Sequence, residues 1–380
     1  MTSDGPNLDV GSSIKKIIVY CLSGLGNVLL FTPTLRRLHE IVPNAEITFL
    51  TVRSGSFEVI KECPFIRPLL IGRGRDRNIF WRLRSFCECL HLRRERFDLS
   101  FVVFPSNRVA HNLVGALIGA RSRVGFRYPY GHISRLGFLQ TVLIDSKPGL
   151  HDIDNNLLLL AALGVEPPTR GTALPEVWTT AEHAARAEKL LASLGIARGD
   201  PFIVYHPVCY PDMRYKRWAP HRFTQLLDRL SADFRLPQLL LGAKSDEREL
   251  SELADRCTVR PALIYNQDLL VVAEVIRAAR LMISNDSGLM QLAGAVQTPV
   301  IGLFGPTRES RTGPRGSRAY VVASHSPARP CRGYPFAADS LACSSNVCSC
   351  MDGISIDDVY QCIRTNSLLD PNTAEAGKVL

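Results

Sequence analysis

Short apolar runs rich in β-branched residues alternate along the chain with longer segments of helical spacing. In both halves such a run is repeatedly followed by a helical pattern. The apolar runs occupy residues 17–22, 45–52, 99–105, 202–207, 237–242, 261–265, 281–286 and 299–305. Strand and helix in regular alternation are typical of parallel sheets whose connecting helices cover both faces. The pattern therefore predicts an α/β protein with two doubly wound, Rossmann-like domains.

Proline and glycine indicate where one domain gives way to the next. With 380 residues the chain is long enough for two domains, and prolines at 167, 168, 175 and 201 interrupt its middle. A helix is expected over residues 180–194, ended by Gly195. We therefore predict a disordered tail at residues 1–13, an N-terminal domain at 14–175, a linker helix at 176–200, a C-terminal domain at 201–365 and a tail at 366–380.

The composition, with 46% hydrophobic and 21% charged residues, is that of a globular protein with sizeable cores. The longest apolar stretch, around residues 157–163, is far shorter than the roughly 20 residues of a membrane span. The first residues lack the basic start and apolar core of a secretory signal. A cytoplasmic location is therefore expected.

Positive charge is concentrated in the first half of the chain. Residues 1–175 contain 22 Lys and Arg against 14 Asp and Glu, whereas residues 176–380 contain 23 against 22. Nine arginines fall between Arg67 and Arg96. The segment is either a solvated surface or a region that attracts an anionic partner. A nucleic acid is not favoured, because the arginines are not interleaved with stacking aromatics in a recognisable module.

Two glycine-containing turns follow predicted strands and open onto predicted helices. The first is Ser23–Asn27, and the second is Asp286–Gly288. Ligands of open α/β sheets bind beyond the carboxyl ends of the strands, and free N–H groups at a helix N-terminus attract anions. The turns are therefore either well-formed turns alone or parts of a ligand site. With two such domains, the cleft between them is the expected active site.

The stretch DSGLMQLAGAVQTPVIGLFGPTRESRTGP closely resembles the hallmark motif of glycosyltransferase family 9, the ADP-heptose:lipopolysaccharide heptosyltransferases. The resemblance spans about residues 14 to 360. It extends to SGLGNVLLFTPTLRRLHEIVPNAEITFLT, RVGFRY, HDIDNNLLLLAALGV, YKRWAPHRF and LLLGAKSDERE. The fold that it implies is the GT-B type, in which two Rossmann-like domains face each other across a cleft.

The resemblance implies an inverting transfer of a sugar, heptose above all, from a nucleotide diphosphate such as ADP-heptose to a hydroxyl of an anionic glycan or glycolipid. It implies no cofactor and no metal, and it implies peripheral contact with the surface of the inner membrane. The N-terminal domain would hold the acceptor and the C-terminal domain the sugar nucleotide. The residues matching the catalytic positions are Asn27 and Lys216. Those assigned to donor binding are Gly26, Lys216, Asp246, Asp286, Ser287, Gly288, Leu289 and Gln291. The residues alone favour a surface lysine beside a packed tryptophan at position 216, and the resemblance reverses that preference.

Two positions depart from the family pattern. Asn27 stands where the family has an aspartate thought to act as general base, and Gln291 replaces the histidine of a G-x-x-H segment. An amide has no useful basicity. Three explanations stay open: another base, binding without turnover, or a deliberate inactivation, which would explain Asn27 but not Gln291. The alternative function is thus a sugar-nucleotide-binding protein with a divergent donor or little turnover.

Cysteines gather near the C-terminus, at positions 331, 343, 348, 350 and 362. Thiolates could hold zinc or iron. However, no C-x2-C pair is present, and the spacing is irregular. Free thiols are the favoured interpretation, and any metal there would be structural.

Overall fold

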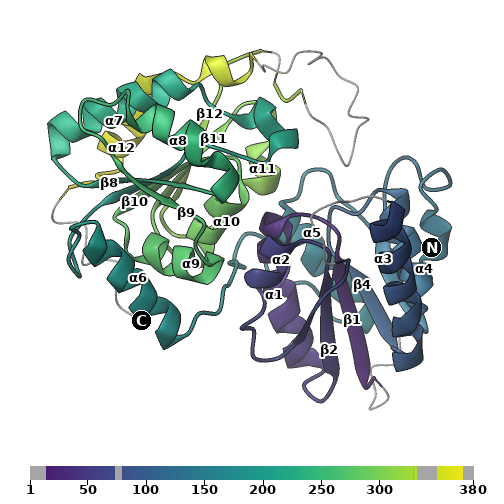
Figure 1. Cartoon of the computed structure of the whole chain (residues 1–380). Helices are drawn as coiled ribbons and strands as arrows, with labels where there is room; N and C mark the ends of the chain where they lie inside the picture. Colours follow the sequence, from purple (N-terminus) through teal and green to yellow (C-terminus); the bar gives the residue numbers. More distant parts are fainter. Residues whose placement is uncertain (1–13, 73–78, 328, 332–348, 371–380) are drawn as a thin grey trace. The chain divides into compact units, whose positions relative to one another are not determined.

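The computed structural model describes residues 14–72, 79–327, 329–331 and 349–370, with the backbone alone for 79–83 (Figure 1). The chain divides into two compact units, which meet in sequence between Trp178 and Thr179. Within the described ranges, none of the helices combines the length and the apolar character that crossing a bilayer requires.

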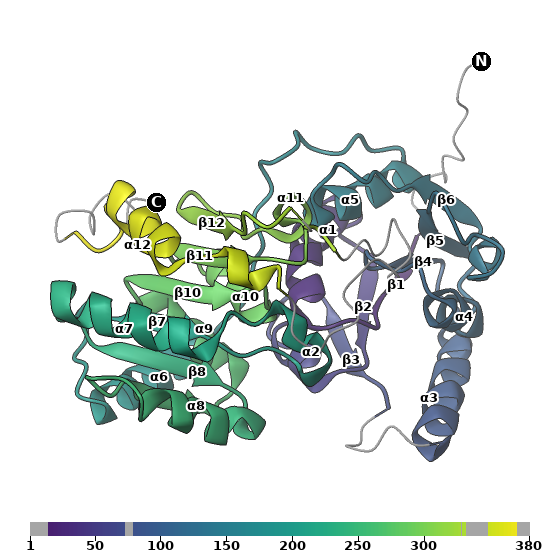
Figure 2. The same ribbon diagram turned by 90° about the horizontal axis from the view of Figure 1, so that it is seen from above.

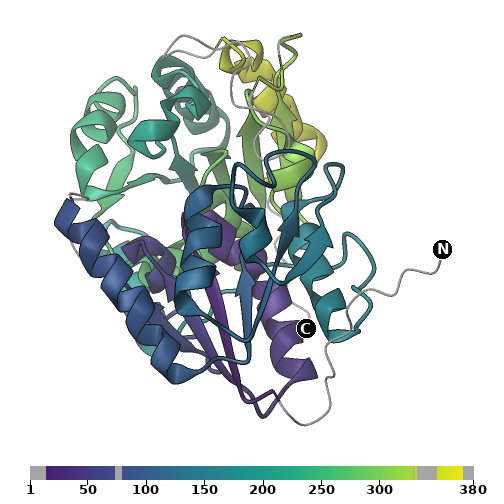
Figure 3. The ribbon, with the colours of Figure 1, turned by 90° about the vertical axis from the view of Figure 1, so that its right-hand side faces the viewer.

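Unit 1 is a six-stranded parallel sheet in the order β3-β2-β1-β4-β5-β6. Its strands are β1 (Lys16–Cys21), β2 (Glu46–Thr51), β3 (Arg67–Leu70), β4 (Leu99–Val102), β5 (Ser122–Arg127) and β6 (Val142–Asp145). Its helices are α1 (Leu25–Ile41), α2 (Ser54–Glu58), α3 (Ile79–Leu92), α4 (Val109–Ile118) and α5 (Asp152–Leu158), with 3-10 turns η1 (Arg93–Glu95), η2 (Gly137–Leu139) and η3 (Leu159–Leu163). Helix α1 packs with α5, and α3 packs with α4. Figure 3 shows α3, in blue, alongside the strands of this sheet.

Unit 2 repeats this architecture, with the order β12-β11-β10-β7-β8-β9. Its strands are β7 (Ile203–His206), β8 (Gln238–Gly242), β9 (Ala262–Tyr265), β10 (Leu281–Asn285), β11 (Val300–Phe304) and β12 (Ala319–Ala323). Its helices are α6 (Ala181–Ser193), α7 (Pro220–Phe234), α8 (Glu247–Ala254), α9 (Leu269–Ala278), α10 (Gly288–Ala295), α11 (Glu309–Thr312) and α12 (Ile356–Thr365), with 3-10 turns η4 (Pro211–Lys216), η5 (Lys244–Asp246) and η6 (Met351–Gly353). Helices α7, α8 and α12 form one layer, and α6, α9 and α10 form the other (Figures 1 and 2).

The strand order reverses once in each sheet, and this point positions the candidate site. In unit 1 the chain adds β2 and β3 on one side of β1 and then returns to place β4 on the other side. In unit 2 it adds β8 and β9 beside β7 and returns to place β10 on the other side. A crevice forms where connections leave neighbouring strands in opposite directions. The β1/β4 and β7/β10 strand ends are therefore the expected ligand sites.

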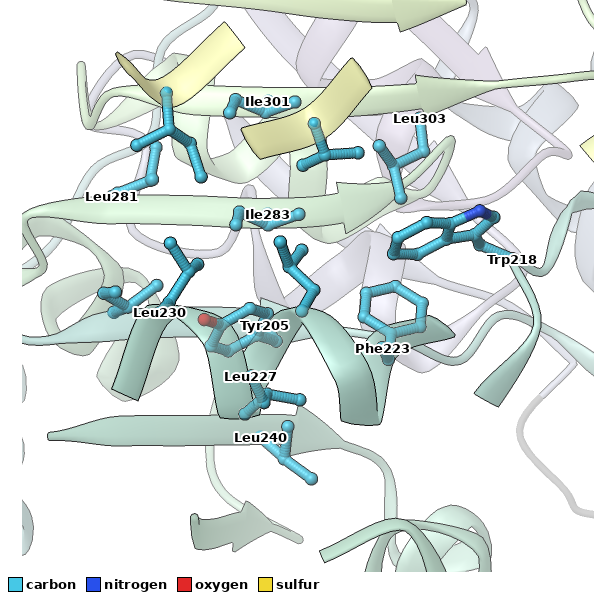
Figure 4. Packing of buried hydrophobic residues seen from close by; sticks show 14 of the residues in the cluster. Tyr205, Trp218, Phe223, Leu227, Leu230, Leu240, Leu281, Ile283, Ile301 and Leu303 are labelled. Atoms are coloured by element: carbon cyan, nitrogen blue, oxygen red, sulfur yellow. The ribbon is translucent and has the colours of Figure 1, made fainter. Parts of the chain in front are cut away.

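The core of unit 2 lies between its sheet and the α7 layer. Figure 4 shows side chains from four adjacent strands meeting those of α7. Trp218 is about 1% exposed and packs edge-to-face on Phe223, with the ring centroids 5.0 Å apart. The continuous apolar runs that predicted the strands are thus explained by burial on both faces, as parallel sheets require.

Two segments differ from the sequence-based expectation. Helix α6, which falls within the expected linker 176–200, belongs to unit 2, where it packs along α9. Leu368 and Leu369 fall in the expected tail 366–380, yet both are buried in the core of unit 2. The physical reason is that α12 presents Val359 and Ile363 to this core, and the chain after it continues over the same apolar surface. Residues 1–13 and 371–380 lie outside the described residues.

Candidate functional site

The turn after β10 forms an ion pair with Lys216 at the β7/β10 switch point. The Lys216 ammonium donates a hydrogen bond to Asp286 Oδ2 over 2.6 Å, and the Thr307 hydroxyl donates to the same oxygen over 2.8 Å. Burial acts to lower the pKa of Lys216, but the charge of Asp286 and its hydrogen bond outweigh burial, so the pKa is raised. Lys216 therefore stays cationic at neutral pH. Within the described residues, Asp286 is the one acceptor of its hydrogen bonds, which leaves two N–H groups for a ligand.

Buried contacts fix the segment that carries Lys216. The Trp218 backbone N–H donates to Asn285 Oδ1 over 3.0 Å, and the Asn285 amide donates to the Pro207 carbonyl over 2.8 Å. The Trp218 indole N–H donates to the Ile354 carbonyl over 2.9 Å. Asn285 thus links the ends of β7 and β10 to the Lys216 segment. The backbone beside Lys216 is thus fixed by contacts with the core of unit 2.

Ser287 and His206 organise the beginning of α10. Ser287 is the N-cap, and its Oγ accepts a hydrogen bond from the Met290 N–H. His206, the last residue of β7, places Nδ1 3.0 Å from the same Oγ. The N–H groups of Gly288 and Leu289 occupy the first helical positions and have no acceptor within the helix. Together with Lys216, they make an edge of the sheet suited to an anion.

His206 is held neutral by its surroundings. Burial lowers its pKa to about 3, with the positive charge of Arg217 acting in the same direction. Below the ordinary histidine pKa of about 6.5 the unfolded chain binds a proton that the folded chain excludes. The contribution of neutral His206 to folding stability is therefore fully present above pH 6.5. This contribution is lost as the pH falls toward about 3.

We expect the melting temperature of unit 2 to fall between pH 6.5 and 4, and the variant His206→Gln to show a shallower fall. The reason is that one such group changes the free energy of unfolding by up to about 1.4 kcal/mol per pH unit. Scanning calorimetry over this range measures the slope. His221→Gln, which changes a histidine at the exposed start of α7, is the matched control. Parallel slopes for the wild type and His206→Gln would contradict this assignment.

The other donor residues expected from the sequence lie in the same unit, in different surroundings. Asp246 follows β8, the strand beside β7, and its Oδ2 accepts from the Ala243 N–H over 2.9 Å. Leu289 is buried in the first turn of α10. Gln291 is about 3% exposed and donates to the Thr312 carbonyl over 2.7 Å. Within the described part of the chain its Oε1 has no hydrogen-bond partner. Gln291 thus ties α10 to α11, a contact that an amide makes without any acid-base role.

Gly26 and Asn27 lie in unit 1, at its own switch point. Helix α1 begins at Leu25 with Gly24 as N-cap, so Asn27 occupies the third helical position. The Asn27 N–H donates to the Gly24 carbonyl over 3.0 Å, and its side chain is half-buried. Ser56 of α2 donates to the Ser23 carbonyl over 3.1 Å and holds the turn. The side chain of Asn27 is therefore placed in the first turn of a helix, at a sheet edge where ligands bind.

The cysteine cluster is described only in part. Cys331 and Cys350 are buried, with their sulfur atoms 3.7 Å apart, and Tyr215 packs against them. Cys343 and Cys348 lie outside the described residues. In the ranges that the structure covers, no three His, Cys, Asp or Glu side chains come together as a metal site would need.

His206 and Thr307 were not predicted as site residues. His206 ends an apolar strand, and a single histidine there gives no signal in sequence. Thr307 follows β11, in the turn Gly305-Pro306-Thr307. Its contact with Asp286 spans 21 residues. The available signal was the position of both residues just beyond strands of one sheet.

Comparisons with known proteins show the family and the fold of the chain. The model of "Glycosyltransferase family 9 (heptosyltransferase)" matches residues 90–341. Lipopolysaccharide heptosyltransferase 3 of Escherichia coli is 26% identical over 293 residues, which cover 74% of this chain and 81% of the relative. The crystal structure of the family 9 glycosyl transferase from Veillonella parvula DSM 2008 superposes with a TM-score of 0.74 at 21% identity, covering 96% of this chain and 99% of the other. E. coli heptosyltransferase WaaC, solved with ADP-2-deoxy-2-fluoro heptose, gives a TM-score of 0.66 at 18% identity over 92% and 99% of the two chains.

The two Rossmann-like sheets are those of the GT-B type fold. The chain belongs to glycosyltransferase family 9, the heptosyltransferase family.

Proposed function

We propose that this protein transfers heptose from ADP-heptose, with inversion and without a metal, to a hydroxyl of an anionic glycan or glycolipid in lipopolysaccharide biosynthesis. The observation that carries the proposal is the Lys216–Asp286 pair beside the start of α10. The identity to E. coli lipopolysaccharide heptosyltransferase 3 and the ADP-sugar bound by E. coli WaaC support the choice of donor.

The residues of unit 2 would act on the departing diphosphate. As the bond between the sugar and the diphosphate breaks, negative charge grows on the bridging oxygen. The Lys216 ammonium and the N–H groups of Gly288 and Leu289 are fixed donors that stabilise this charge without reorganising. Asp286 orients Lys216, and Thr307 in turn orients Asp286. The same groups supply the positive charge that a metal ion would otherwise bring.

In unit 1, Asn27 would orient the acceptor. Its amide can accept a hydrogen bond from the attacking hydroxyl, but it cannot take the proton away. Gly26 beside it leaves room for a sugar to approach the backbone. The proton then leaves to another carboxylate or to water.

A second candidate function is binding of a sugar nucleotide with little turnover. The specific observations are the neutral amide of Asn27 and the hydrogen bond that commits Gln291 to the Thr312 carbonyl. Both positions that depart from the family pattern thus carry groups without basicity. The donor site in unit 2 would still bind nucleotide.

Incubation with a panel of sugar nucleotides separates the two functions. The purified protein is given ADP-heptose, ADP-glucose, GDP-mannose and UDP-glucose, with and without a lipopolysaccharide core extract, and the nucleoside diphosphate released is quantified. We expect ADP release from ADP-heptose that increases with the extract. Tight binding of ADP-heptose without release of ADP would favour the second function, binding with little turnover. Preference for another sugar nucleotide would contradict the assignment of ADP-heptose as the donor.

A further inference from the structure

Two buried thiols face each other close to the candidate donor site. Cys331 and Cys350 are 5% and 0% exposed, and their sulfur atoms lie 3.7 Å apart although the residues are 19 positions apart in sequence. Both are present as thiols. In a disulfide the sulfur atoms are about 2.05 Å apart, so these two need to approach each other by roughly 1.7 Å. A small rotation of one side chain supplies a movement of that size.

The segment that carries Cys331 holds the turn after β11. Arg329 lies two residues before Cys331. Its Nε donates a hydrogen bond to the Gly305 carbonyl over 3.0 Å, and its Nη2 donates to the Thr307 carbonyl over 3.2 Å. The Thr307 hydroxyl in turn donates to Asp286, the partner of the donor-site lysine. The position of Cys331 is therefore coupled to the carboxylate of the donor site.

The segment that carries Cys350 packs against the same turn from another side. A Cβ atom on Gly305 would lie 2.5 Å from Met351 Sδ and 3.0 Å from the Cys350 carbonyl carbon, so the two backbones approach closely here. Farther along this segment, the Ile354 carbonyl accepts the hydrogen bond of the Trp218 indole. The two cysteines thus belong to two separate segments that meet at Gly305.

Tyr215 connects the thiol pair to the donor site directly. Its side chain packs against Cys331 and Cys350, and it immediately precedes Lys216 in sequence. The Tyr215 hydroxyl also donates to Met213 Sδ over 3.1 Å, within the 3-10 turn η4 that ends at Lys216. A covalent change at the two sulfur atoms therefore acts on residues that adjoin both members of the Lys216–Asp286 pair.

We propose that Cys331 and Cys350 are a site of reversible covalent modification, at which a disulfide oxidant such as oxidised glutathione converts the two thiols into an intramolecular disulfide. Among the described residues, no third His, Cys, Asp or Glu side chain joins the pair as a metal site would need, which favours chemistry between the two sulfur atoms. The disulfide itself does not depend on the proposed function, but its importance for donor binding rests on that function.

The reaction is a thiol–disulfide exchange in two steps. The Cys331 thiolate, at the more exposed of the two positions, attacks one sulfur of oxidised glutathione and releases one glutathione as its thiolate. The Cys350 thiolate then attacks the Cys331 sulfur of this mixed disulfide, and the second glutathione leaves. The two cysteine sulfurs are oxidised by two electrons in total, glutathione disulfide is reduced by the same two, and the cysteine protons pass to the two glutathione thiols. An excess of reduced thiol reverses both steps.

The disulfide should order the donor turn. It closes a loop of about 20 residues and so restricts the unfolded chain. It also ties together the two segments that meet at Gly305. We expect the oxidised protein to melt roughly 5 to 10 °C above the reduced protein. Amide hydrogen exchange in residues 303–307 should slow roughly threefold or more, because this turn opens less often.

The test is made on the full chain without nucleotide, so its result does not depend on which donor the protein uses. The protein is equilibrated with oxidised or reduced glutathione, the remaining thiols are alkylated, and the digest is analysed by mass spectrometry. We expect a peptide in which Cys331 is linked to Cys350, lighter than the reduced pair by two hydrogen atoms and lost after dithiothreitol. Calorimetry and hydrogen exchange are then measured on the same two samples.

The variants Cys331→Ser and Cys350→Ser should each abolish the difference between the oxidised and reduced samples. Each variant is compared with itself under the two conditions, so any effect of serine on its basal stability cancels. Cys87→Ser removes an exposed thiol of unit 1 and is the matched control. It should keep both the linked peptide and the rise in melting temperature.

Several results would overturn the proposal. They are a mixed disulfide with glutathione that never resolves, a link from either cysteine to a different one, and stoichiometric zinc or iron in the purified protein that Cys331→Ser releases. A linked peptide without any change in melting temperature or in exchange of residues 303–307 would overturn the connection to the donor turn. Failure of the protein to bind ADP would contradict the proposed function and leave the linked peptide standing.

Discussion

Replacing Lys216 with alanine is expected to reduce sugar transfer by about 100- to 1,000-fold, the loss typical when one fixed donor to a developing anion is removed. The Lys216 side chain is largely buried beside Asp286, where water screens its charge less than at the surface. Nucleotide affinity should fall at least several-fold, because the diphosphate loses the same contact in the ground state. Calorimetry with ADP gives the affinity, and ADP release gives the rate.

The variant also leaves Asp286 without its partner, so stability must be separated from catalysis. Loss of one member of a buried pair costs about 3–5 kcal/mol in unfavourable cases, although Thr307 still donates to Asp286 here. The double variant Lys216→Met/Asp286→Asn carries no unpaired charge and should recover the melting temperature while transfer stays low. Lys244→Ala, at an exposed position in the 3-10 turn η5 after β8, is the matched control. Unchanged ADP affinity in Lys216→Ala would remove Lys216 from the site.

The variant Asn27→Asp is expected to raise the transfer rate. It places a carboxylate where the family has its aspartate, and general-base catalysis typically contributes about 100- to 10,000-fold. Helix α1 has no acidic residue in its first turn, so an ionised carboxylate at this position is also favoured by the helix N-terminus. Leu25 and Gly26 keep the family's form and fix the turn that carries the side chain. The initial rate of ADP release at saturating donor measures the effect.

The opposite outcome is equally informative. If another carboxylate already serves as base, the added charge brings little and repels the departing diphosphate. A substantial rate with Asn27 that falls in the aspartate variant would therefore contradict the proposal. Asn266→Asp, which introduces the same change at an exposed position after β9, controls for the added charge.

Much of the fold could be predicted from the sequence, because both sheets are buried on both faces. The apolar runs that this burial demands are continuous and are separated by helical spacing. Helix α7 begins at Pro220 and ends at Phe234, as its proline start and apolar spacing predict. The C-terminal end of the second domain could not be predicted in this way. Leu368 and Leu369 follow α12 without a periodic pattern, and only the tertiary core shows why they are buried.

The parts of the candidate site formed by residues adjacent in sequence could be predicted. The contacts between residues far apart in sequence could not. Ser287 and Gly288 form a strand–turn–helix unit whose role can be inferred from neighbouring residues. The bond between His206 and Ser287 joins residues 81 positions apart, and that between Lys216 and Asp286 joins residues 70 apart. The family pattern indicated Lys216, while nothing local indicated its carboxylate partner. The charge count found the basic half of the chain, but the pairing of Arg67 with Glu95 could be seen only in the fold.

The central claim is that the β7/β10 switch point of unit 2 holds the diphosphate of the sugar nucleotide. A crystal structure of the protein with ADP-heptose, or with a non-transferable analogue, tests it most directly. We predict diphosphate oxygens within about 3 Å of Lys216 Nζ and of the Gly288 and Leu289 N–H groups, with Asp286 still bonded to Lys216. A nucleotide bound at another edge of the sheet, with Lys216 paired to Asp286 and free of the ligand, would contradict it.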